Sequence, residues 1–295
     1  MTHHFCAHTF IAETIETKNA VSDPNTHAKL RAFLKTNEPK FAEWTREQWR
    51  QFARELTDRE ITAMVEAGTI PPALSGRMSD QYAALINDRY APRWEAALKA
   101  GRDLAPKDVR ELLTPDVIRE WIDTRRPWLL TSLTDTQRRS VEAILRHHLT
   151  IDPVDQRTLA TLLRPSLGLT DQQSSRLLKL HAQLKKDGVN PDQIRLQLGR
   201  QAAREQRLRA ERIARTELAG AHNGGTQITM ERAVDSGAFP KGLRRVWSAQ
   251  RGKTCPICAS LNGRSAAMTA PFDGAYNLPP AHPTCRCVVL YMEGV

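Results

Sequence analysis

Five side chains near the C-terminal end of the chain have the types and spacing of a metal site. Cys255 and Cys258 are separated by two residues, and His282, Cys285 and Cys287 follow farther along the chain. Two cysteines at this spacing can turn both sulfurs toward one cation, and a second Cys/His group downstream can complete a tetrahedron. Zinc favours such sulfur and nitrogen ligands, so we predict a structural Zn2+ site in this region.

The five candidates exceed the four ligands of a closed tetrahedral site. Cys255, Cys258 and Cys285 are the firmest, while His282 and Cys287 compete for the fourth position. Reduced thiols and a disulfide are the alternatives. The N-terminus lacks the basic start and apolar run of a secretory signal, so we expect a reducing compartment and favour metal. Four protein ligands leave no place for a reactive water, which indicates a structural role.

Composition and charge narrow the class of protein. The chain has 295 residues, of which 40% are hydrophobic and 26% charged, which is typical of a soluble globular protein of about two domains. No apolar run reaches the roughly 18 residues that would span a bilayer, so we expect no membrane contact. The formal net charge of +10 favours a polyanionic partner, with nucleic acid first.

Most of the chain before residue 223 is predicted to be helical. Helix starts are indicated by Asn190 before Pro191 and by four capping-box patterns. These patterns pair Thr45 with Gln48, Thr57 with Glu60, Thr134 with Gln137, and Thr170 with Gln173. After the run His222-Asn223-Gly224-Gly225 we expect the helical body to end. One more amphipathic stretch, from Thr226 to Val234, is predicted to end near Gly237, and two strands follow at residues 243–248 and 288–292.

The predicted fold is therefore mainly α, an elongated helical body with a small C-terminal α+β module stapled by zinc. So few strands bury little surface, and such a module needs a metal or disulfide to remain folded. We divide the chain into a disordered N-terminus (1–30), a variable helical region (31–165) and a third region (166–295) that ends in the C-terminal module (238–295).

The helix that opens at Pro191 carries the densest charge. Its candidate DNA contacts are Arg200, Arg204, Arg207 and Arg209. The alternative is that these arginines form ion pairs within the helix. Glu205 and Arg209, and likewise Glu211 and Arg215, are opposite charges four residues apart. Any DNA contact would be non-specific, because no groove-reading motif is present.

The segment Arg212-Ile213-Ala214-Arg215-Thr216-Glu217, followed by Asn223-Gly224, resembles the central signature of the Mu F-type minor head proteins of tailed phages. The downstream pattern, from Val246-Trp247 through both Cys/His groups to Cys287, is similar to the same family. The resemblance covers roughly residues 167–292. Where many members carry an acidic residue shortly before the first cysteine, this chain has none.

The resemblance implies a structural protein, not an enzyme, present in a few copies in the capsid interior at the portal vertex. It implies partners among the portal, capsid and scaffold proteins, assembly in the bacterial cytoplasm, and a role in head morphogenesis and in genome packaging or ejection. Arg212, Arg215, Thr216, Glu217 and Asn223 form its structural motif, in which we expect Arg215 and Glu217 to bond backbone groups of the zinc module. The alternatives are a stand-alone DNA-binding zinc module and a metal-dependent hydrolase.

Overall fold

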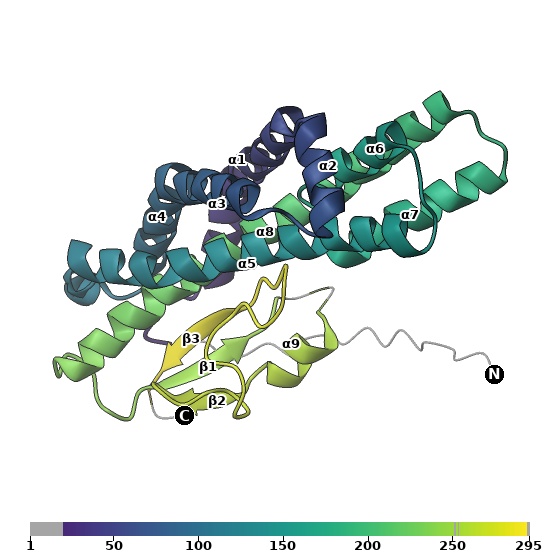
Figure 1. The fold of residues 1–295 in the computed structure, drawn as a ribbon. Coiled ribbons are helices and arrows are strands. Elements are labelled where there is room, and N and C mark those ends of the chain that lie inside the picture. The colour runs from purple at the N-terminus through teal and green to yellow at the C-terminus, as the bar shows by residue number, and fades with distance from the viewer. Residues whose placement is uncertain (1–19, 251, 253, 294–295) are drawn as a thin grey trace, which may run out of the picture. The chain divides into compact units, whose positions relative to one another are not determined.

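The computed structural model describes residues 20–250, 252 and 254–293, and these residues are mainly helical, as predicted (Figure 1). They form two compact units. Three long helices contribute residues to both units: α1 (Thr26–Glu55), α5 (Pro115–Thr150) and α8 (Pro191–Asp235). The other elements are α2 (Asp58–Ala67), α3 (Pro72–Leu85), η1 (Ile86–Tyr90), α4 (Ala91–Arg102), η2 (Lys107–Leu112), α6 (Gln156–Ser166), α7 (Asp171–Lys186), α9 (Pro256–Leu261), β1 (Arg244–Ser248), β2 (Ser265–Ala267) and β3 (Val288–Met292). None of the helices described is both long enough and apolar enough to cross a membrane.

The unit that comprises Pro39–Pro92 and Ile122–Glu211 is built around Trp49. Trp49 is fully buried, and its indole Nε1 donates a hydrogen bond to Tyr82 Oη at 3.0 Å. Gly168 lies against the indole ring with φ at +88°, and its N–H donates to Gln137 Oε1 at 2.8 Å. A Cβ at this position would overlap the Trp49 ring, so glycine is required both for the backbone angle and for the close approach.

Two of the four predicted capping boxes are confirmed and two are wrong. Thr57 and Thr170 each cap a helix, α2 and α7, with the reciprocal bonds from Glu60 and Gln173. Thr45 and Thr134 instead lie inside α1 and α5. Their hydroxyls donate to the carbonyl groups of residues four positions earlier, at 2.9 and 3.0 Å. This is the bond that a threonine makes inside a helix, where it does not act as a cap.

The sheet belongs to the other unit, which comprises Met1–Glu38, Arg93–Trp121 and Arg212–Val295. Strand β1 lies between β2 and β3, and both pairings are antiparallel (Figure 1). The strands predicted at residues 243–248 and 288–292 are confirmed as β1 and β3, whereas the three-residue β2 was missed. Trp247, Phe272 and Tyr291 are buried in one hydrophobic cluster that also contains Cys258 and Cys285.

Residues 20–30, which we expected to be disordered, are ordered. Ala20 forms an antiparallel bridge with Met292, Val21 N–H donates to the Tyr291 carbonyl oxygen at 2.7 Å, and α1 begins at Thr26. The polar composition of this stretch misled the prediction because its backbone bonds to the open edge of β3. The remainder of the predicted disordered segment, residues 1–19, lies outside the described residues.

We predicted that the helical body ends near residue 222, and this is wrong. Helix α8 continues through Gly224 and Gly225 to Asp235. Gly225 and Gly101 permit close packing within this unit. A Cβ at Gly225 would overlap the backbone of Leu98 in α4, and a Cβ at Gly101 would overlap the carbonyl oxygen of His222. Thr226 Oγ1 also donates to the Gly101 carbonyl at 2.8 Å. Glycine weakens an isolated helix, but here it permits two helix backbones to touch.

We therefore expect Gly225→Ala to destabilise the protein even though alanine is the better helix former. Overlap with the Leu98 backbone should lower the free energy of unfolding by about 2 kcal/mol or more. Gly220→Ala is the matched control on the same helix, because its Cβ would meet only Pro280 at an ordinary 3.5 Å. That control should be neutral or stabilising by up to about 1 kcal/mol. Urea denaturation of the two variants measures the difference, and equal stability would contradict the packing role.

Candidate metal centre

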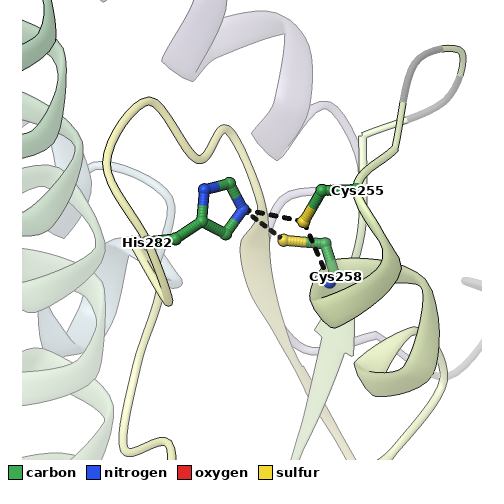
Figure 2. Close-up of side chains that lie close together, drawn as sticks. All are labelled: Cys255, Cys258 and His282. Carbon is green, nitrogen blue, oxygen red and sulfur yellow. Dashed lines mark hydrogen bonds between the residues drawn. The ribbon is translucent and has the colours of Figure 1, made fainter.

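Three of the predicted ligands point toward one another (Figure 2). His282 Nε2 lies 3.0 Å from Cys255 Sγ and 3.1 Å from Cys258 Sγ. Cys255 is the N-cap of α9, and its sulfur accepts a hydrogen bond from Cys258 N–H at 3.3 Å. Pro256 occupies the first helical turn. The short helix thus fixes both sulfurs of the Cys-x-x-Cys pair on the side that faces His282.

A second group of ligands shares Cys258 with the first. Cys258, Cys285 and Cys287 have sulfur atoms within 4.8 Å of one another, and Cys258 Sγ lies 3.6 Å from Cys285 Sγ. The turn that positions Cys285 includes Thr284 with φ at +68° and a bond from Cys285 N–H to the His282 carbonyl at 3.1 Å. The structure therefore brings all five predicted residues together, with Cys258 common to both groups. Such a cluster can bind a metal ion.

The imidazole of His282 is oriented for metal binding by its other nitrogen. Nδ1 lies 2.9 Å from the carbonyl oxygen of Pro283, an arrangement that places the ring proton on Nδ1. Nε2 then carries the lone pair and faces both sulfurs. A backbone carbonyl that fixes the tautomer in this way is the usual outer-shell partner of a metal-binding histidine.

The thiols interact strongly with one another. A hydrogen bond from Cys258, and secondly one with Cys287, lowers the pKa of Cys285, whereas the bond to Cys285 raises the pKa of Cys258. Arg215 and Arg286 line the same cavity of about 520 Å³ as the five candidate ligands.

Helix α8 holds the second Cys/His group through two residues of the predicted structural motif. Thr216 Oγ1 accepts a hydrogen bond from Thr284 N–H at 3.3 Å, and Asn223 Nδ2 donates to the Cys287 carbonyl at 3.3 Å. The side chain of Arg212 is exposed, and its carbonyl accepts from the Thr216 hydroxyl at 2.8 Å. The motif thus positions backbone on both sides of Cys285.

Arg215 has a different partner from the one expected. We predicted bonds to backbone groups of the module, but its guanidinium forms an ion pair with Glu38 of α1, with Nε 2.9 Å from Oε2. Glu38 was not found from the sequence, because an isolated glutamate far along the chain carries no pattern. Glu217 is buried, and its expected bonds to the module stay a prediction.

Arg209, one of the four candidate DNA contacts, is buried. Its Nη1 donates to the Leu169 carbonyl at 3.2 Å, its guanidinium lies 5.1 Å from the centre of the Trp49 ring, and burial lowers its pKa. Glu205, expected to pair with Arg209, instead accepts hydrogen bonds from Gln173 and Arg176. Arg209 is therefore a core residue, and the exposed candidates are Arg200, Arg204 and Arg207.

Residues 178–290 match the family described as Phage Mu protein F like protein. The match confirms the resemblance predicted from the sequence over this segment. The matched segment includes all of α8 and all five candidate ligands. No curated protein and no solved structure matches the chain.

Because Cys258 belongs to both groups of ligands, we expect Cys258→Ser to damage the centre more than any change on the exposed face of α8. Metal binding contributes on the order of 10 kcal/mol in small zinc domains, whereas an exposed arginine contributes about 0.5 kcal/mol or less. The variant should lose bound metal and expose the C-terminal module to protease. Arg204→Gln is the control and should keep both properties. Elemental analysis and limited proteolysis provide the measurements, and equal protease resistance of the two variants would contradict a stabilising metal.

Proposed function

We propose that the chain is a minor head protein that acts at the portal vertex, in head morphogenesis and in genome packaging or ejection. The family match over residues 178–290 is the observation that carries this proposal. The geometry supports it, because the matched segment holds a cluster suited to keeping a small fold together. Its partners would be the portal, capsid and scaffold proteins, with assembly in the host cytoplasm and a final place inside the virion.

The metal we propose is zinc, held by Cys255, Cys258, His282 and Cys285. Metal–sulfur bonds of about 2.3 Å place two sulfurs of a tetrahedral site roughly 3.8 Å apart, and the Cys258–Cys285 separation of 3.6 Å is close to that value. His282 is preferred to Cys287 as the fourth ligand because its Nε2 already faces two of the sulfurs. With every ligand position taken by protein, such an ion stabilises the fold and offers no site for hydrolysis. A hydrolytic activity lost on chelation would contradict this assignment.

Portal docking can be tested in heads assembled from the proteins of the same phage genome, with and without the portal protein. We expect a few copies of this protein per head when the portal is present and none when it is omitted. The major capsid protein serves as the internal standard for quantitative mass spectrometry of purified heads. Equal incorporation in heads without portal would contradict docking at that vertex.

Direct contact with the genome is a second candidate function, favoured by three exposed arginines on α8. Arg200, Arg204 and Arg207 are spaced by four and three residues, which puts them on one helix face. Since each neutralised phosphate releases counterions, binding through this face would be non-specific and would weaken steeply with salt.

The test replaces Arg200, Arg204 and Arg207 by glutamine and titrates duplex DNA at several salt concentrations. Loss of three phosphate contacts should reduce the slope of log affinity against log salt by about 2.7, at roughly 0.9 per phosphate. A variant with glutamine at the exposed Arg139, Arg146 and Arg157 removes the same charge elsewhere and should keep the slope. Identical slopes for the two variants would leave net charge, rather than this face, as the source of any binding.

A further inference from the structure

The cluster holds one more ligand than a tetrahedral ion can use. If zinc takes Cys255, Cys258, His282 and Cys285, the thiol of Cys287 remains within 4.8 Å of two ligating sulfurs. All five residues line one cavity of about 520 Å³, which is large enough to admit a molecule the size of hydrogen peroxide. Peroxide that enters this cavity can reach the closely spaced cysteine sulfurs. Besides binding metal, these sulfurs can therefore be oxidised.

We propose that Cys258 and Cys285 are a peroxide-sensitive modification site, at which an intramolecular disulfide replaces the metal as the link within the C-terminal module. The proposal rests on the metal centre proposed above. Cys258 Sγ and Cys285 Sγ lie 3.6 Å apart, so formation of a bond of about 2.05 Å requires only a small closing movement of the two side chains. Both residues lie in the hydrophobic cluster around Trp247, which keeps their backbones in place.

The reaction balances as follows. The thiolate of one cysteine attacks hydrogen peroxide, the O–O bond breaks, and the products are a sulfenic acid and, after protonation, one water. The second thiol attacks the sulfenic sulfur and displaces hydroxide, which leaves as a second water with the thiol proton. Two thiols have then lost two electrons to the peroxide, and the metal ion departs because two of its ligands are joined to each other.

The neighbouring pairs are less suited to this bond. Cys255 Sγ is directed to His282 Nε2 and to Cys258 N–H within the turn that opens α9. The Cys287 carbonyl is bound by Asn223, and only one residue separates Cys287 from Cys285, which makes a bond between those two strained. A Cys258–Cys285 bond would instead join α9 to the segment that leads into β3. That is the same connection that the metal makes, so the module would stay folded under conditions that remove the metal.

Trypsin separates the relevant cysteines, which makes the bond directly readable. Cleavage after Lys253, Arg264 and Arg286 gives peptide 254–264 with Cys255 and Cys258, peptide 265–286 with Cys285, and peptide 287–295 with Cys287. The full-length protein, purified under reducing conditions and analysed for metal, is treated with hydrogen peroxide, alkylated, digested without reductant and examined by mass spectrometry. Released zinc is followed with a chromogenic chelator.

We expect peptide 254–264 to be joined to peptide 265–286, with one metal ion released per disulfide and with metal binding restored by dithiothreitol and zinc. The link should persist in Cys255→Ser and Cys287→Ser and be absent in Cys285→Ser. A link to peptide 287–295, a Cys255–Cys258 bond inside one peptide, irreversible oxidation only, or unchanged thiols would each overturn the proposal. Absence of metal in the purified protein would refute the metal centre instead, and the peptide map would still decide whether the disulfide forms.

Discussion

Two separate segments of the C-terminal module converge at Cys258, which belongs to both groups of candidate ligands. Its sheet has only three short strands, and so small an element cannot bury enough apolar surface to remain folded by itself. Because Cys258 belongs to both groups, a metal ion bound there would join α9 to the segment that carries His282 and Cys285. The buried ring of Trp247 packs in the same hydrophobic cluster as Cys258 and Cys285, so loss of the link would also loosen the core around the sheet.

Helix α8 contributes no candidate ligand, but its side chains bind the backbone of the segment that carries Cys285 and Cys287. Thr216 and Asn223, about two turns apart, bond to the backbone of Thr284 and Cys287 on either side of Cys285. Farther along the same helix, Gly225 lets the backbone of α4 approach closely. Such contacts require small or hydrogen-bonding residues at fixed helix positions, which gives a physical reason for the residue types in the motif. Thr216 and Asn223 contact the backbone of the C-terminal module, and Arg215 contacts Glu38, so each of these polar side chains has a partner within the fold.

The sequence was informative where the determinants are local. The spacing of the cysteines predicted the cluster, and short segments rich in valine, leucine and aromatic residues predicted β1 and β3, because each signal lies within a few neighbouring residues. The failures have a common cause in distant partners. The Gly224-Gly225 pair resembles a helix end, but the backbone of Leu98 lies against Gly225. Thr45 resembles a cap, but α1 continues on both sides of it. The pairing of Arg215 with Glu38 joins residues far apart in the chain, and no spacing rule reports it.

The arginines of α8 show most clearly why charge counting could not assign function. Arg209 is buried against Trp49, where its guanidinium satisfies a backbone carbonyl, and Arg215 is committed to Glu38. Neither contributes an available positive charge to a phosphate, although both counted toward the surplus that suggested nucleic acid. The exposed members of the series, Arg200, Arg204, Arg207 and Arg212, keep a positive charge that is available to a polyanion. The arginines of α8 therefore have three different environments, which are the buried core, an ion pair within the protein and the exposed surface. The environment of each arginine, and not the number of arginines, determines whether its charge is available to a partner.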